Sequence, residues 1–137
     1  MERSKILTEK VSDYKNAIDS FSIAIDLDLS KYKNIELDLL KNGQIQKFEY
    51  VLELCWKILK LFLNEIHGIE SVSPKSAIKE FFGIGMIDEA EYELLIQMID
   101  DRNRLSHIYN EIFYRLEIYS RLNDYLAMLG KVYNKVL

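Results

Sequence analysis

Hydrophobic residues recur three and four positions apart along almost the whole chain, which is the spacing of one face of an α-helix. The pattern predicts a first helix from about Ser4 to Ile25, followed by a connection from Asp26 to Asn34 with Ser30 and Asn34 as candidate caps. A long second helix is expected from about Ile35 to His67, and Gly68 is a suitable left-handed stop.

The second half of the chain predicts shorter helices separated by clear turn signals. Ser73-Pro74 matches a cap followed by a first-turn proline, opening a short helix that ends at about Phe82, before Gly83 and Gly85. Asp88 and Glu91 have the spacing of a capping box, ahead of a helix that begins at Glu89 and continues into the segment around residue 102. A last helix runs to about Val136.

Together these elements predict an all-α fold, an antiparallel up-and-down four-helix bundle with a short extra helix in the crossover. At 137 residues the chain is expected to form a single domain over 1–137. The second helix is apolar around most of its girth and keeps only a narrow polar strip. We therefore expect a two-fold homodimer to cover it, although a central helix in a monomer would show the same pattern. The polar strip comprises Gln46, Glu49, Glu53, Lys57, Lys60 and Asn64.

Composition narrows the function classes. The chain is 49% hydrophobic with five glycines and one proline, which disfavours disorder and all-β folds. Cys55 is the single cysteine, so no internal disulfide can form, and the charged N-terminus does not resemble a signal peptide. No apolar run is long enough for a membrane span. We expect a cytoplasmic protein without membrane contact, and the net charge of −4 disfavours a general nucleic-acid binder.

Candidate chemistry is concentrated between residues 100 and 109. Arg102 is permanently charged and suits phosphate, whereas His107 can donate or accept a proton near neutral pH. Arg102 would stabilise the charge on a phosphorane-like transition state, His107 would transfer the proton, and Asn103 would orient the phosphate or the histidine. None of these roles needs a metal, and Asp100 and Asp101 are expected to be solvated or paired with arginine.

The spacing of the two main residues poses a geometric problem. Arg102 and His107 are five residues apart, so on one straight helix they point about 140° from each other. The helix could break near Ser106, where serine can cap a new helix, or a second copy of the chain could bring its own segment alongside. Long side chains would also narrow the gap.

The pattern Arg102-Asn103-x-x-x-His107-x-Tyr109 resembles the Arg-x4-His-x-Tyr signature of HEPN domains, specifically those paired with minimal nucleotidyltransferases. Phe48-Glu49 followed by Glu53-x-x-Trp56-Lys57 is similar to a helix of the same branch, often called nucleotidyltransferase substrate-binding proteins. The likeness extends from about Gln44 to the end of the chain. Its departures are an added Arg104, Ile108 at a position that is often threonine, and Cys55 beside the tryptophan.

This resemblance implies a helical bundle that dimerises with the Arg-His segments meeting in a cleft. It also implies a metal-independent endoribonuclease of the toxin type, with Arg102, His107 and Asn103 as catalytic residues and Arg104 and Ser106 as contacts to the RNA phosphate. A nucleotidyltransferase partner, holding its own ATP and Mg²⁺, would act as antitoxin by transferring AMP to Tyr109.

Two alternatives remain. The first is that the chain is a non-catalytic, substrate-binding partner of a nucleotidyltransferase. The second is that it is a structural dimer whose motif only stabilises the interface. For Arg102 the competing interpretations are an ordinary surface pair with Asp101 or Ser106, or a salt bridge across the dimer interface.

Overall fold

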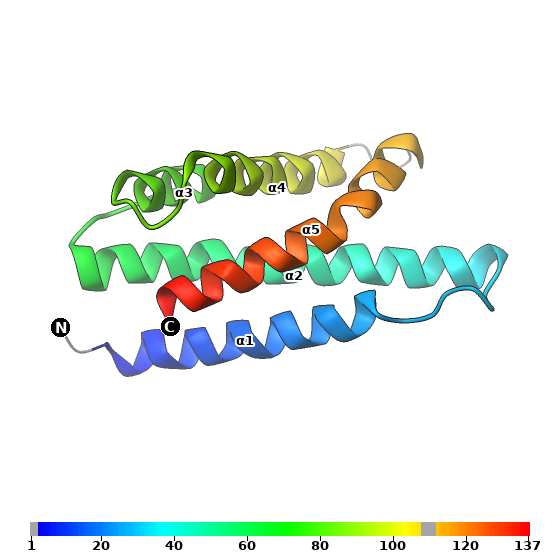
Figure 1. Ribbon diagram of the computed structural model, residues 1–137, viewed down its shortest axis with the longest axis horizontal. Helices are drawn as coiled ribbons and strands as arrows, with labels where there is room; N and C mark the ends of the chain where they lie inside the picture. The colour runs from blue at the N-terminus through cyan, green and yellow to red at the C-terminus, as the bar shows by residue number, and fades with distance from the viewer. Residues whose placement is uncertain (1–2, 108–111) are drawn as a thin grey trace.

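The computed structural model describes residues 3–107 and 112–137, and every regular element within them is a helix (Figure 1). The four long helices run alternately in opposite directions, and a short helix occupies the crossover between the second and third of them. This confirms the predicted bundle, with helix ends that nearly coincide with the predicted ones. The helices are α1 (Lys5–Ile25), α2 (Asn34–His67), α3 (Pro74–Gly83), α4 (Glu89–His107) and α5 (Ile112–Val136).

The long helix α2 is the axis of the fold. All four other helices contact it, with α1 and α4 on opposite sides and α5 lying obliquely across it (Figure 1). A single chain therefore covers most of the apolar girth of α2, which removes the reason given above for requiring a second copy there. The homodimer stays a prediction. Exposed apolar residues of α2 lie in its N-terminal half: Ile35, Leu39 and Tyr50.

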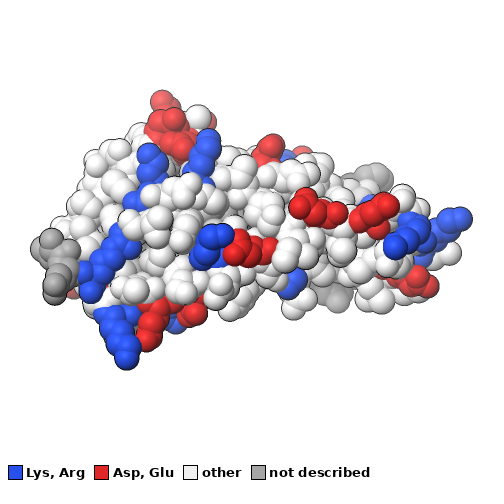
Figure 2. All heavy atoms as spheres, turned by 60° about the horizontal axis from the view of Figure 1, so that its bottom comes forward, with Lys and Arg blue, Asp and Glu red and all other residues white. Residues whose placement is uncertain are grey.

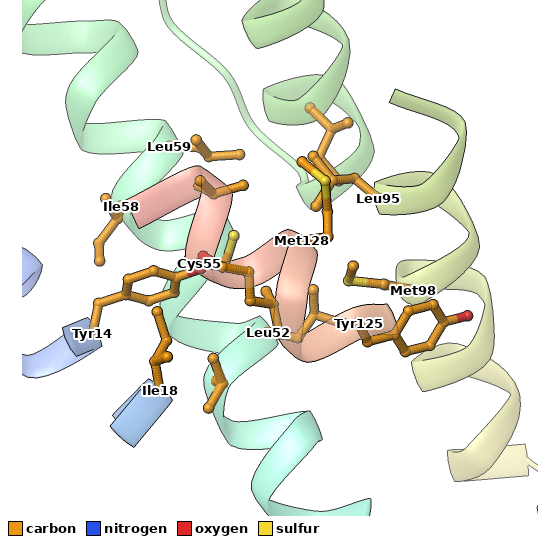
Figure 3. Packing of buried hydrophobic residues seen from close by; sticks show 14 of the residues in the cluster. Tyr14, Ile18, Leu52, Cys55, Ile58, Leu59, Leu95, Met98, Tyr125 and Met128 are labelled. Atoms are coloured by element: carbon orange, nitrogen blue, oxygen red, sulfur yellow. Dashed lines mark hydrogen bonds between the residues drawn. The ribbon is translucent and has the colours of Figure 1, made fainter. Parts of the chain in front are cut away.

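Side chains from four helices interlock in the core (Figure 3). Tyr14 of α1 is fully buried, and its hydroxyl donates a 2.7 Å hydrogen bond to the Leu129 carbonyl of α5. Cys55 lies in the same layer, and burial raises the pKa of its thiol to about 12. A thiol with that pKa stays protonated at neutral pH, so Cys55 acts as a packing residue, as the sequence predicts.

Two of the helices bury an aliphatic residue other than the one that the three-and-four spacing favours, which is Ile6 in α1 and Leu116 in α5. In α1 the buried position near the N-terminus is Leu7, whereas Ile6 is exposed. In α5 the core face includes Ile118, while Leu116 is 48% exposed. The apolar pattern is ambiguous at both places because each helix carries aliphatic residues on two adjacent faces, and packing against α2 selects one of them.

Local capping agrees with the sequence signals at three helix starts. The Ser4 hydroxyl accepts a hydrogen bond from the Leu7 amide, and Ser73 and Ser76 form a reciprocal capping box. Asp88 and Glu91 likewise bond each other's amides, at 2.8 and 3.0 Å. The start of α2 differs from prediction. Lys33 occupies its N-cap position without a side-chain cap bond, and Asn34 takes a left-handed backbone conformation with φ 55° instead of capping.

Among the residues that the structure describes, none of the helices combines the length and hydropathy that crossing a membrane would require.

Candidate functional site

Three consecutive charged residues of α4 each pair with a different helix. Asp100 forms an ion pair with Lys75 of α3, Asp101 with Arg121 of α5, and Arg102 with Glu53 of α2. Successive residues on a helix point about 100° apart, so three neighbours reach three directions. The C-terminal half of α4, which carries the candidate motif, is thereby fixed from three sides.

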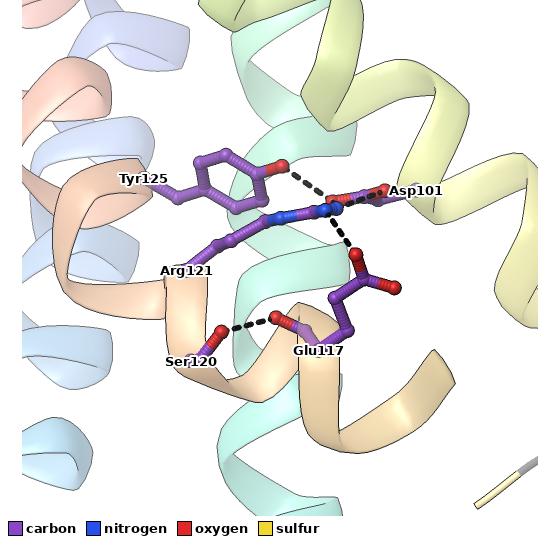
Figure 4. Close-up of polar contacts among 5 residues, drawn as sticks. All are labelled: Asp101, Glu117, Ser120, Arg121 and Tyr125. Atoms are coloured by element: carbon purple, nitrogen blue, oxygen red, sulfur yellow. Dashed lines mark hydrogen bonds and ion pairs between the residues drawn. The ribbon is translucent and has the colours of Figure 1, made fainter. Parts of the chain in front are cut away.

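Asp101 is the centre of the strongest of these contacts (Figure 4). Its side chain is almost completely buried, and both carboxylate oxygens accept hydrogen bonds from Arg121 Nη1 at 3.0 and 2.9 Å. The hydroxyl of Tyr125 donates to the same carboxylate, and Arg121 also bonds Glu117 at 2.9 Å. A buried carboxylate with this many donors needs no metal to compensate it, which confirms the arginine-pairing role for Asp101.

Arg102 turns toward α2, where its Nη2 lies 2.8 Å from a carboxylate oxygen of Glu53. Its partner is thus neither Asp101 nor Ser106. The two side chains are 35% and 29% exposed, and an ion pair that open contributes only about 0–1 kcal/mol. The Nε atom of Arg102 is buried without a hydrogen bond among the described residues.

The other motif residues follow α4 to its end. Asn103 and Arg104 have exposed side chains. The Ser106 hydroxyl donates to the Asn103 carbonyl at 2.7 Å instead of capping a new helix. α4 ends at His107, one residue after Ser106, and α5 begins at Ile112, so the helix ends close to the position at which a break was considered. The side chain of His107, and all of Tyr109, lie outside what the structure describes.

A groove of about 770 Å³ lies between α2 and α5, and Leu105 near the end of α4 also lines it. Glu49, one turn before Glu53 on α2, lines it together with Arg115 of α5. Partial burial raises the pKa of the Glu49 carboxyl, and the positive charges of Arg102 and Arg115 offset only part of that increase. The Arg115 guanidinium also donates a hydrogen bond to the Asn42 side chain, which joins α5 to α2 across the groove.

Charges of both signs are interspersed over the face shown in Figure 2, without an extended basic area. This agrees with the net charge of −4. Any contact with an anion would depend on a few local cations, of which Arg102, Arg104 and Arg115 lie near the end of α4.

Sequence reasoning missed the partners of Arg102. It placed Glu49 and Glu53 in a polar strip of the second helix, yet both are half-buried and lie toward α4 and the groove. A signal was available, because the two carboxylates are one turn apart within the same block as Trp56. No motif in the sequence indicated that the groove would be shared by Asn42, Arg115 and Tyr119.

Comparison with known proteins assigns the chain to a family. The model for "nucleotidyltransferase substrate binding protein like" matches residues 9–137, and the chain therefore belongs to that family. No curated protein matches the chain.

Solved structures agree with this fold. A crystal structure of a protein from Thermus thermophilus is similar to this chain with a TM-score of 0.78 and 29% sequence identity. The alignment covers 90% of this chain and 98% of the Thermus chain, so the likeness extends over the whole bundle.

Replacing Asp101 with asparagine should lower the free energy of unfolding by about 3 kcal/mol, because it leaves the Arg121 charge without its buried partner. Urea denaturation followed by circular dichroism measures the change. Asp100→Asn, the matched control, removes an exposed ion pair and should cost less than about 1 kcal/mol. Equal effects of the two substitutions would contradict the proposed anchoring of α4.

The Glu49 carboxyl should titrate above its ordinary pKa of 4.5 in an NMR titration of the side-chain carbonyl carbons. The folded state binds this proton more tightly than the unfolded chain, so this group makes the fold progressively less stable as pH rises from 4.5 through the raised pKa. Arg102→Gln should raise the pKa further, whereas Lys131→Gln should leave it unchanged. A value at or below 4.5 would refute the assignment.

Proposed function

We propose that this chain is the helical subunit of a two-component system whose other component is a nucleotidyltransferase. The observation that supports it is the family match over residues 9–137, since that family is described by its relation to nucleotidyltransferases. The candidate motif on the last turns of α4 has exposed polar side chains at Asn103 and Arg104, as a contact site for a nucleotide or a protein requires.

For the chemistry of the motif we propose metal-independent cleavage of RNA by Arg102 and His107. His107 would take the proton of a ribose hydroxyl, and Arg102 would stabilise the charge that develops on the phosphate. Asn103 would orient the phosphate, while Arg104 and Ser106 would hold the RNA backbone. The pairing of Arg102 with Glu53 is weak enough for a phosphate to replace it.

The proposed site is shared between two copies of the chain. Because α4 continues without a break to His107, residues 102 and 107 leave the helix about 140° apart. A two-fold dimer brings Arg102 of one copy toward His107 of the other, so that each cleft receives both groups. The homodimer is therefore part of this proposal.

Regulation would come from the partner. Transfer of AMP from ATP to the Tyr109 hydroxyl would place a negatively charged, bulky group two residues from His107 and would silence RNA cleavage. ATP and Mg²⁺ belong to the nucleotidyltransferase in this proposal.

A second candidate is a non-catalytic subunit that binds substrate for the nucleotidyltransferase. It is favoured by the Arg102–Glu53 ion pair, which gives the arginine a partner without any ligand. In that case the exposed end of α4 would serve only as a docking site for the partner.

RNA cleavage by the purified chain in EDTA distinguishes these candidates. We expect products ending in a cyclic phosphate, and His107→Ala should lower the cleavage rate by about 10²–10⁴-fold. Arg102→Ala should lower it by about 10²–10³-fold. Lys131→Ala removes an exposed positive charge of α5 and should have no effect. If the wild-type chain, freed of its partner, cleaves no RNA, the catalytic proposal is wrong and the binding role remains.

Intact-mass measurement after incubation with the cognate nucleotidyltransferase, ATP and Mg²⁺ tests the regulatory step. We expect the mass to increase by whole AMP groups, and Tyr109→Phe should abolish the increase. Tyr50→Phe alters an exposed tyrosine of α2 and serves as the control. A mass increase that persists in Tyr109→Phe would show that the acceptor lies elsewhere.

A further inference from the structure

The groove lined by Glu49, Leu105 and Arg115 has features that the proposed cleavage chemistry does not use. It extends away from the motif along α2 and α5, and its volume of about 770 Å³ is enough for one nucleotide. Aliphatic side chains provide its apolar lining, and the ring of Tyr119 completes the α5 side. The aliphatic residues are Ile45, Leu105 and Leu116.

The groove combines flat and aliphatic surfaces. Tyr119 is only partly buried, and the ammonium of Lys41 lies 5.1 Å from the centroid of its ring. Leu116 is nearly half exposed, although it belongs to a helix whose core face is formed by other residues. An aromatic ring with neighbouring aliphatic side chains matches the face of a nucleobase, which stacks regardless of sequence.

One carboxylate provides the groove with directional recognition. Glu49 lines the groove and is half-buried. An ionised carboxylate only accepts hydrogen bonds, and it accepts two side by side. Guanine presents two adjacent donors, N1–H and the N2 amino group, on its Watson–Crick edge. Adenine and cytosine present a donor beside an acceptor, and uracil presents a single donor, so a carboxylate distinguishes guanine from the other three bases.

The charges at the groove also suit a nucleotide. Lys41 and Arg115 are its cations, and Asp38 and Glu49 are its acids. Asp38 accepts a 3.2 Å hydrogen bond from the side-chain amide of Asn42, whereas Glu49 is the groove carboxylate that interacts electrostatically with Arg102 and Arg115. A phosphate attached to a base in the groove would therefore have two arginines, Arg102 and Arg115, in the electrostatic neighbourhood of Glu49.

We propose that this groove is a nucleobase-binding subsite that prefers guanine, with Glu49 accepting from the base edge and Tyr119 stacking on its face. The inference rests on the proposed function, because the base and the phosphate at Arg102 would belong to the same nucleotide chain. It adds a sequence preference, cleavage or binding next to guanine, that the motif alone does not specify.

The test uses the full-length chain and the four mononucleotides 5′-GMP, 5′-AMP, 5′-CMP and 5′-UMP, with dissociation constants from isothermal titration calorimetry. GMP should bind roughly tenfold or more tightly than the other three, which is the discrimination expected of a good bidentate contact to a base. Glu49→Gln should remove this preference while weaker binding of all four remains. Tyr119→Leu should weaken all four by roughly tenfold.

Two substitutions elsewhere on the chain serve as controls. Tyr32 lies outside the groove and also has a lysine ammonium near its ring, at 5.8 Å, so Tyr32→Leu repeats the Tyr119 substitution away from the site. Glu93→Gln removes an exposed carboxylate of α4. Neither should change the affinity for GMP. Thermal unfolding of each variant identifies loss of fold, and Glu49→Gln tests the proposal even if Tyr119→Leu does not fold.

Equal affinity for the four nucleotides, no binding at millimolar concentration, or an unchanged preference in Glu49→Gln would each overturn this inference. Its failure is distinguishable from failure of the proposed function. RNA cleavage that depends on His107 but shows no base preference would refute the subsite alone. A guanine preference in a chain that cleaves no RNA would refute the catalytic role and retain the subsite.

Discussion

Burial of α2 on nearly all sides is the constraint from which the rest of the architecture follows. A helix with apolar residues around most of its girth is stable in water only if other helices cover it, and here α1, α3, α4 and α5 all do so. The cover is incomplete at the N-terminal half of α2, which extends beyond α3 and α4 (Figure 1). That half carries Glu49 and lines the groove, so the same packing that forms the core also determines where a ligand can enter.

The segment of α4 that carries the motif is held by contacts with three other helices. The buried carboxylate of Asp101 holds α4 to α5, while the exposed pairs on either side of it connect α4 to α3 and α2. Exposed pairs contribute little to stability, so Asp101 provides most of the anchoring energy and its neighbours mainly set orientation. The side chain of Arg102 is thereby directed at Glu53 of α2.

The sequence predicted the bundle well because its signals are periodic and local. Helix ends such as Ser73-Pro74 and Gly68 are determined by short-range hydrogen bonds and backbone preferences, and they lie where expected. Which of two nearby aliphatic residues is buried depends on contacts with a distant helix, and the pattern alone did not resolve it. This holds for Ile6 against Leu7 and for Leu116 against Ile118. Glu53 as the partner of Arg102 is a contact of the same long-range kind.

The electrostatics near Arg102 explain how an acidic chain could handle an anionic substrate. Arg102 and Arg115 interact with two glutamates, Glu49 and Glu53. The formal charges of these four side chains cancel, so they add little electrostatic repulsion to the folded state. A phosphate would replace Glu53 at Arg102 and leave Glu49 for contacts to donors of a base. Because the ion pair being replaced is weak, affinity would depend on how many new bonds the ligand makes. The affinity of such a site for a ligand would depend on specific hydrogen bonds and shape complementarity rather than on net charge. This is consistent with the mixed charges of the surrounding surface.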